Sequence, residues 1–364
     1  MTIRALKRAV RRTLLRGPHW SFATSYTRHL WRRARGERRE PEYDLVFLVH
    51  SHWDTWILTG ICREIERHSG LRCAYHAWPG TELPPPARAY FVSHYSLFPS
   101  LLREDPSFWT ARTLVWYTHP AEHGVDDASM FWALRQASHV VAPCSSSQAL
   151  VVDGGVPAER ASCVLGGADP LLFPPHERGG GVVGFSTAFY PRKAPDRVLE
   201  LVRAMPHRRF LMLGRHWSRY ERWNELRALP NFEYVEPEYA DYPGYYRRMD
   251  VFVSPALLEG GPIPLLETMM CNVVPVASRT GFAPDLVRHG ENGFLFDVDA
   301  PTGEICELIE QAFALRADVH ATVARYSWAA FTHELLDLVP ADTFPRDGAR
   351  GAAERVMPAV AARG

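Results

Sequence analysis

The chain has 364 residues, a length that predicts about two domains. Hydrophobic residues make up 46% and charged residues 23%, which is ordinary globular composition and excludes a disordered or low-complexity chain. No apolar run approaches the ~18 residues that span a bilayer, which argues against a transmembrane protein. The six cysteines form no CxxC pair, which argues against a zinc ribbon or a thioredoxin-like site.

The net charge of zero hides a basic N-terminal arm. Residues 1–40 hold 12 Lys/Arg and 2 Asp/Glu, which leaves 29 basic and 39 acidic residues for the rest. The acidic body argues against a nucleic-acid-binding core. In the arm, apolar and aromatic residues recur among the basic ones: Ile3, Leu6, Val10, Leu14, Trp20, Phe22, Tyr26, Leu30 and Trp31. This pattern favours a basic amphipathic helix on an anionic membrane surface; the alternatives are a solvated tail, a cleaved transit peptide and a helix packed on the first domain.

After the arm, residues 41–172 read as alternating strands and helices. Runs with the length of buried strands lie at Leu45–Val49, Ala89–Val92, Leu114–Tyr117 and Val140–Ala142. Amphipathic stretches at Trp56–Arg67 and Met130–Gln136 predict helices between them. This alternation predicts a parallel sheet covered by helices on both faces.

A second α/β series follows a boundary of proline and glycine at Pro170–Gly181. We expect the second domain over residues 180–326. Its predicted strands are Val182–Ser186, Phe210–Leu213, Phe232–Val235, Val251–Ser254, Val273–Ala277 and Phe294–Phe296. Its predicted helices are Asp196–Ala204, Arg219–Leu229, Pro264–Met270 and Thr302–Ala317. Two Rossmann-like domains therefore face each other, and the cleft at the carboxyl ends of their strands is the expected ligand site.

The segment 250–297 carries the functional signal. Its first strand ends at Ser254-Pro255, a loop with Glu259-Gly260-Gly261 follows, and a helix begins near Pro264. Glu267 lies in the first turns of that helix, eight positions after Glu259. The arrangement offers backbone N–H groups and a positive helix end to an anion, with a carboxylate on each side. Carboxylates accept hydrogen bonds from sugar hydroxyls, so the pattern fits a nucleotide sugar.

These residues resemble the E-x7-E signature of family 4 of the retaining GT-B glycosyltransferases. The neighbouring text agrees at Pro275-Val276-Ala277-Ser278 and at His289-Gly290-Glu291-Asn292-Gly293-Phe294. Upstream, Gly166-Gly167-Ala168-Asp169 with Phe173 resembles an interdomain "NGVD…F" stretch, and Pro191-Arg192-Lys193 with Asp196 resembles a "PxKG(x)D" helix start. The resemblance covers residues 160–340 well and residues 43–160 loosely.

The resemblance implies a GT-B fold with an N-terminal acceptor domain and a C-terminal nucleotide-sugar donor domain. A closing helix opening at Ser327-Trp328 would return to the first domain over residues 327–340, followed by a flexible tail at 341–364. It also implies a retaining transferase that needs no metal or other cofactor and serves cell-surface glycan, glycolipid or polysaccharide biosynthesis. With the basic arm, we expect a cytoplasmic protein, peripheral on the inner face of the membrane, with a glycan or lipid-linked acceptor.

The resemblance also assigns roles to single residues. Glu259 would contact the donor sugar, Lys193 would neutralise the departing pyrophosphate, and His119 would face the reacting centre from the acceptor side. Glu267 would bind the ribose. The remaining donor-site residues would be Gly260, Gly261, Arg192 and Ile263.

Three departures from the family pattern stand out. An arginine that usually precedes the phosphate lysine by five residues is Ala188 here. Pro262 removes one backbone N–H from the donor loop. The usual N-terminal Gly-rich loop reads His50-Ser51-His52-Trp53-Asp54, and we expect His50, His52 and Asp54 to touch donor or acceptor.

Other functions remain open beside the transferase. Ala188 and Pro262 motivate a catalytically silent GT-B protein that acts as a binding or accessory subunit. A phosphorylase or epimerase on the same fold is a third hypothesis, because fold does not dictate chemistry.

A metal site is the least favoured interpretation of the polar residues. His119 and His123 have helical spacing, but Pro120 disfavours a helix between them and no third ligand is evident. A plain turn is the better interpretation of Asp297 and Asp299, because they follow a predicted strand.

Overall fold

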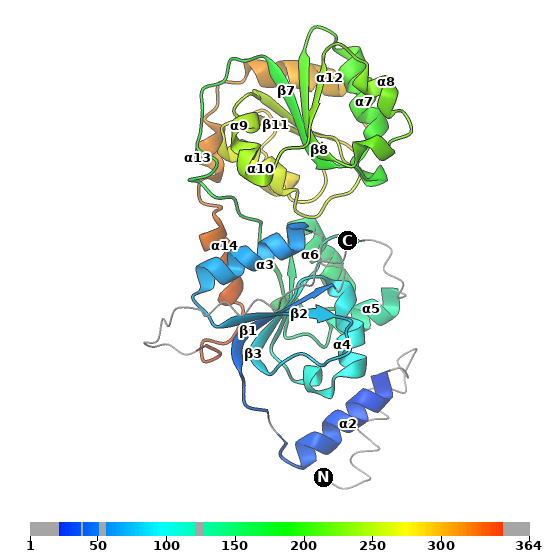
Figure 1. Ribbon diagram of the computed structural model, residues 1–364, viewed down its shortest axis with the longest axis vertical. Helices are drawn as coiled ribbons and strands as arrows, with labels where there is room; N and C mark the ends of the chain where they lie inside the picture. The colour runs from blue at the N-terminus through cyan, green and yellow to red at the C-terminus, as the bar shows by residue number, and fades with distance from the viewer. Residues whose placement is uncertain (1–21, 38, 51–55, 121–126, 345–364) are drawn as a thin grey trace, which may run out of the picture.

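A computed structural model describes residues 22–37, 39–50, 56–120 and 127–344, and shows two α/β domains stacked along the long axis (Figure 1). Each domain is built on one six-stranded parallel sheet. The predicted pair of parallel sheets covered by helices is confirmed. The predictions for residues 1–21, His52, Asp54, His123 and the tail beyond 344 lie outside the described residues.

The first sheet has the strand order β2-β1-β3-β4-β5-β6. Its strands are β1 (Tyr43–His50), β2 (Cys73–Trp78), β3 (Ala87–Val92), β4 (Thr113–Trp116), β5 (His139–Ala142) and β6 (Ala161–Cys163). The helices of this part of the chain are α2 (Ala23–Ala34), α3 (Trp56–Ser69), α4 (Phe98–Glu104), α5 (Asp127–Leu134) and α6 (Ser145–Asp153). Short 3-10 turns lie at η2 (Tyr95–Leu97), η3 (Pro106–Trp109) and η4 (Ala158–Arg160).

The second sheet has the order β12-β11-β10-β7-β8-β9. Its strands are β7 (Val182–Ala188), β8 (Arg209–Arg215), β9 (Phe232–Val235), β10 (Val251–Ser254), β11 (Val274–Ser278) and β12 (Phe294–Phe296). Its helices are α7 (Pro195–Ala204), α8 (Trp223–Arg227), α9 (Tyr242–Tyr246), α10 (Ile263–Met270), α11 (Ala283–Leu286), α12 (Thr302–Ala314) and α13 (Val319–Val323). Three-residue 3-10 turns lie at η5 (Pro191–Lys193), η6 (Trp217–Arg219) and η7 (Tyr239–Asp241).

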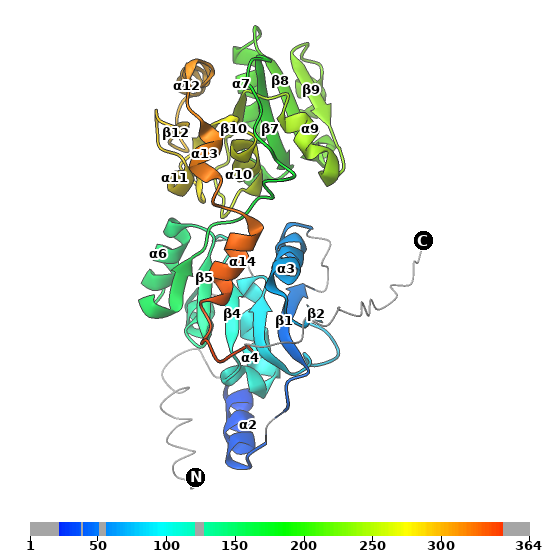
Figure 2. The same cartoon turned by 90° about the vertical axis from the view of Figure 1, so that its left-hand side faces the viewer.

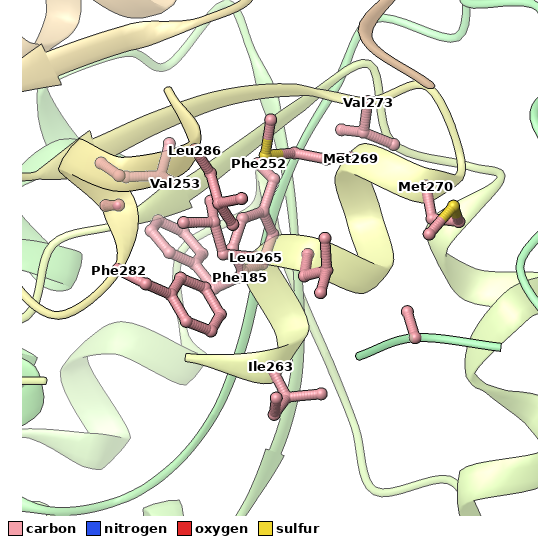
Figure 3. Packing of buried hydrophobic residues seen from close by; sticks show 14 of the residues in the cluster. Phe185, Phe252, Val253, Ile263, Leu265, Met269, Met270, Val273, Phe282 and Leu286 are labelled. Carbon is pink, nitrogen blue, oxygen red and sulfur yellow. The ribbon is translucent and has the colours of Figure 1, made fainter. Parts of the chain in front are cut away.

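Both sheets are buried on two faces, which is why their strands appear as continuous apolar runs. In β1, Leu45 and Phe47 pack into one core cluster and Val46 and Leu48 into another on the opposite face. In the second domain, α10 packs Leu265 and Met269 into the cluster that holds Phe252 of β10 (Figure 3). This packing holds the N-terminus of α10 at the carboxyl edge of the sheet.

The chain crosses back to the first domain through α14 (Trp328–Leu336). The Ser327 hydroxyl caps this helix by accepting a hydrogen bond from the Ala330 N–H at 3.1 Å. The helix lies beside α3 (Figure 2), and Phe331 meets Trp116 of β4 edge-on with ring centroids 5.7 Å apart. The predicted helix that returns to the first domain is confirmed.

Part of the basic arm is a helix docked on the first domain. Helix α2 packs against α4 and η3, at the end of that domain away from the second one (Figure 1). Phe22 is 1% exposed and its ring centroid lies 4.8 Å from that of Trp132. The prediction that Phe22 and Leu30 anchor a membrane is wrong, because both side chains face the protein; Trp31 is 51% exposed. No helix among the described residues is long and apolar enough to cross a membrane.

A few elements differ from their predictions. The predicted helix Arg219–Leu229 overlaps only the last residue of η6 and the five residues of α8. The strands β2 and β6 were not predicted. Both lie at sheet edges, where half-buried residues such as Tyr75 and His76 replace a continuous apolar run.

Candidate active site

Glu259 is the centre of a buried charge cluster at the carboxyl edge of the second sheet. Its side chain is 6% exposed, and the ammonium of Lys193 donates to Oε1. Arg192 donates from Nη1 to Oε2 of Glu259 at 3.1 Å and to the carbonyl oxygen of Leu258 at 3.0 Å. The structure therefore brings three of the predicted site residues into direct contact.

Local backbone conformation aims these side chains at one another. Lys193 ends η5, which follows β7, and the next residue, Ala194, adopts the left-handed region at φ 52°. Glu259 lies in the loop after β10. The Leu257 N–H donates to the Arg192 carbonyl oxygen at 2.8 Å, which joins the two loops. Adjacent strands of one parallel sheet thus deliver the carboxylate and the two cations to the same place.

Burial and the neighbouring carboxylate act in opposite directions on the pKa of Lys193. Desolvation lowers the pKa of its ammonium, and the neighbouring Glu259 carboxylate opposes that effect. A buried charge is tolerated when an opposite charge and hydrogen bonds compensate its lost hydration. Glu259 and Lys193 compensate each other in this way.

Glu267 lies deeper, in the second turn of α10, where it is 1% exposed. Tyr239 donates to Oε1 at 2.5 Å and Tyr246 donates to Oε2 at 3.1 Å. Burial raises the pKa of Glu267 to about 7, while the two tyrosine hydrogen bonds act in the opposite direction. Each carboxylate oxygen therefore already accepts one hydrogen bond, and that of Oε1 comes from Tyr239, which is 37% exposed.

The N-terminus of α10 offers fewer backbone donors than the sequence indicated. The Ile263 N–H donates to Gly261 O at 2.9 Å and the Leu265 N–H donates to Pro262 O at 2.8 Å. Pro264 has no N–H. The expectation that this first turn presents N–H groups to an anion is therefore wrong for these three residues. What remains there is the positive end of the helix dipole.

Gly260, Gly261 and Ile263 pack at the junction of the two domains. A Cβ on Gly260 would lie 1.8 Å from the carbonyl oxygen of Thr118, so only glycine allows this approach. The Ile263 side chain is buried, and a Cβ on Gly166 of the linker would lie 2.4 Å from its Cδ1. Whatever they contribute to a donor, these residues hold the donor loop against the first domain.

The first domain meets this loop with polar groups at the ends of its strands. His119 follows β4, and its Nδ1 lies 3.1 Å from Pro120 O. Burial lowers the pKa of His119, and the charges of Arg192, Glu259 and Lys193 all act on it. His119 is thus electrostatically coupled to the cluster around Glu259, across the domain junction.

Sequence reasoning missed His94, which joins two of these strand ends. Its Nε2 lies 3.3 Å from Thr118 Oγ1 and its Nδ1 lies 2.7 Å from Ser96 Oγ. Ser96 Oγ is 3.4 Å from Nε2 of His50, the one residue of the predicted His50/His52/Asp54 set that the structure describes. The sequence position of His94 could have indicated it as a site residue, because His94 closely follows a predicted strand, as His119 does.

A separate cavity of about 490 Å³ lies at the junction beside α14. Its lining residues are Cys163, Leu165, Gly166, Asp285, Arg325, Tyr326, Ser327, Ala330, Phe331 and Glu334. None of the predicted site residues contributes to it.

Asp297, for which a turn was predicted, follows β12 and pairs with Arg279 at 3.1 Å.

Comparison with known proteins identifies the second domain. Residues 174–325 match the family model of glycosyl transferases group 1. The matched residues cover most of the second domain. Alpha-maltose-1-phosphate synthase from Mycobacterium tuberculosis is 37% identical over 102 residues, 24% of this chain and 26% of that protein. Sucrose synthase from Melioribacter roseus is 24% identical over 132 residues, 33% of this chain and 17% of that protein. The matches thus span about a quarter or less of these relatives.

The two domains together have the GT-B fold, so the predicted fold class is confirmed. Anabaena Alr3699/HepE in complex with UDP superposes with a TM-score of 0.65 at 14% identity, over 81% of this chain and 98% of that one. Sucrose-phosphate synthase from Thermosynechococcus elongatus superposes with a TM-score of 0.64 at 15% identity, over 82% of this chain and 98% of that one. The apo form of the lipopolysaccharide outer core galactosyltransferase WaaB superposes with a TM-score of 0.64 at 13% identity, over 81% of this chain and 98% of that one. At these identities the likeness concerns the fold.

Proposed function

We propose that this chain is a retaining glycosyltransferase that moves a sugar from a nucleotide-sugar donor to a glycan or lipid-linked acceptor. One observation carries the proposal: Glu259, Lys193 and Arg192 form a buried cluster within the domain that matches the family model of glycosyl transferases group 1, at the junction with the strand end that holds His119. Support for the donor class comes from Anabaena HepE, whose structures contain UDP and UDP-glucose.

In this proposal the donor exchanges partners with the charge cluster. The leaving diphosphate forms an ionic contact with the ammonium of Lys193, and sugar hydroxyls donate hydrogen bonds to the Glu259 carboxylate. Each buried charge then keeps a partner throughout binding, which avoids the cost of an unpaired buried ion. Because the cation is already positioned in a water-poor site, it stabilises the charge that develops on the diphosphate with little rearrangement.

Retention follows if acceptor and leaving group occupy the same face of an oxocarbenium-like sugar. The diphosphate is then the base nearest to the incoming acceptor hydroxyl. We place His119 on the acceptor side, where its lowered pKa keeps the imidazole neutral near pH 7. His50 and His94 would extend this polar surface toward the acceptor.

The nucleoside would lie against Glu267. Ribose hydroxyls are donors, and they would replace the Tyr239 hydroxyl on the Glu267 carboxylate. We propose that no metal is required, because Lys193 and the helix dipole supply the positive charge for the diphosphate.

The acceptor and the cellular location belong to the same proposal. A basic segment with 12 Lys/Arg in residues 1–40 favours an anionic surface. We propose that the protein works peripherally on the inner face of a membrane, in cell-surface glycan, glycolipid or polysaccharide biosynthesis. Because α2 docks on the first domain, membrane contact would involve residues 1–21 and the exposed basic residues of α2, such as Arg28 and Arg33.

A panel of UDP-, ADP-, GDP- and TDP-sugars tests the proposal. A ligand at 100 times its dissociation constant adds about 2.7 kcal/mol of stability, which a thermal unfolding assay detects. The nucleotide sugar that stabilises the protein is then incubated with the protein and with glycan or lipid-linked acceptors, in the presence and in the absence of EDTA. The anomeric configuration of the product is determined. Inversion would contradict retention, and activity lost with EDTA would contradict metal independence.

The alternative is a catalytically silent binding subunit. It is motivated by Ala188, by Pro262 and by the occupied N–H groups at the start of α10. Donor binding without hydrolysis or transfer by the purified protein would favour this alternative, and turnover of the donor would exclude it.

A further inference from the structure

Arg215 ends β8 directly beside Ala188, which ends β7. The two residues are register partners in the parallel ladder between these strands. Side chains of register partners leave the same face of a parallel sheet. An arginine therefore stands next to the position where the family resemblance expects a cation and this sequence has alanine.

The hydrogen bonds of Ser186 identify the face. Its hydroxyl lies 3.0 Å from the Tyr246 hydroxyl, which in turn donates to Glu267. Ser186 and Ala188 are two residues apart in β7, so they point to the same side of the sheet. Ala188 and its neighbour Arg215 therefore face the side that holds Glu267.

A tyrosine joins Arg215 to the surroundings of Glu267. Arg215 is half-buried and acts on the Tyr242 phenol, whose pKa is raised by burial and lowered by the charge of Arg215. The Tyr242 ring lies 5.3 Å from Tyr239 and 5.7 Å from Tyr246, the two tyrosines that bind Glu267.

We propose that Arg215 binds the diphosphate of the nucleotide donor, in the place that Ala188 leaves without a cation. The assignment rests on the proposed function. A donor that reaches both Lys193, which follows β7, and Glu267, which lies on this face, passes the ends of β7 and β8. A guanidinium at that point offers paired N–H donors to phosphate oxygens, which a lysine does not.

The test compares Arg215→Gln with a matched control at the other end of the same strand, Arg209→Gln. Binding of UDP, ADP, GDP and TDP, and of their nucleosides, is measured by calorimetry. We expect Arg215→Gln to weaken the diphosphate that the wild type binds by about 10-fold or more, the value of one hydrogen bond to a charged group. Affinity for the corresponding nucleoside stays within about 2-fold, and Arg209→Gln changes neither.

A compensating exchange separates a phosphate contact from a structural role. Adding Ala188→Arg to Arg215→Gln returns an arginine to the same face one strand away, so diphosphate affinity rises again. Equal losses for diphosphate and nucleoside, or no loss at all, would overturn the Arg215 assignment and leave the proposed function standing. A wild type that binds none of the four diphosphates overturns the proposed function, and the assignment with it.

Discussion

The ammonium of Lys193 is hydrogen-bonded to the carboxylate of Glu259. The first residue follows β7 and the second follows β10, two neighbouring strands of the second sheet. In the proposed function, Lys193 binds the leaving phosphate and Glu259 binds the donor sugar. Each of the two groups would therefore exchange the other for a part of the donor. The predictions for this pair follow from that exchange.

Replacing Glu259 by Gln removes the charge that holds Lys193 and Arg192. We expect sugar transfer to fall by roughly 10- to 100-fold, because the sugar loses a charged hydrogen-bond partner. Affinity for the bare nucleoside diphosphate stays equal or increases, since two cations become free for phosphate. Calorimetry and turnover assays check both values, with Glu267→Ala as the contrast that weakens the bare nucleotide. Wild-type turnover in Glu259→Gln would remove its assignment to the sugar.

Lys193→Ala removes the buried cation assigned to the leaving group. We expect turnover to fall by at least ~10²-fold, the usual effect of losing one preorganised charge stabiliser. Lys193 and Lys7 are the two lysines of the chain, so a lysine-directed label followed by mass spectrometry reports on Lys193 individually. Burial lowers the pKa of Lys193, which favours the neutral amine that reacts with the label. A bound nucleoside diphosphate should protect Lys193 from the label. Labelling unaffected by every diphosphate would argue against the phosphate contact.

Glu267 makes the stability of the second domain depend on pH. Its pKa is about 7 in the folded protein, above the ordinary value of 4.5, so folding favours the protonated form. Its contribution is fully present below pH 4.5 and is lost as the pH rises through 7, by on the order of 3 kcal/mol. Glu267→Gln should flatten this part of the profile of unfolding temperature against pH. The exposed Glu304→Gln serves as control, and parallel profiles for wild type and Glu267→Gln would contradict the prediction.

Phe22→Ala tests whether α2 is part of the first domain. Phe22 is fully buried against Trp109 and Trp132, and removing such a ring costs about 3–5 kcal/mol. Thermal unfolding should show a clear loss of stability. Trp31→Ala, on the exposed side of the same helix, should have little effect. Equal and small effects of the two substitutions would mean that α2 contributes little to folding.

Membrane association is tested by deleting residues 1–21, which leaves α2 and its packing in place. The full chain should sediment with anionic liposomes at low salt and be released as salt screens the charges. The shortened chain should bind less. If both chains stay in the supernatant at low salt, the membrane proposal fails and the lipid-linked acceptor loses its main support.

The fold class could be predicted from the amino-acid sequence, because strands buried on both faces appear as apolar runs at recognisable spacing. Runs such as Val251–Ser254 and Phe294–Phe296 became β10 and β12 with the predicted bounds. Glu259 and Glu267, which the E-x7-E spacing singled out, are both buried in the second domain, and their roles stay predictions. The edge strands β2 and β6 were not predicted, and the packing of α2 on the first domain was only one of several alternatives. The burial of these elements depends on partners far away in the chain.

Which polar groups meet depends on the tertiary structure. The pairing of Glu259 with Lys193 spans 66 residues and results from β7 and β10 being adjacent in the sheet. The same applies to Arg215 beside Ala188 and to His94 beside Thr118. Strand order and register are long-range choices that a local pattern does not encode. The order and register of β7 and β8 place Arg215 beside Ala188, where the family resemblance leads one to expect a cation.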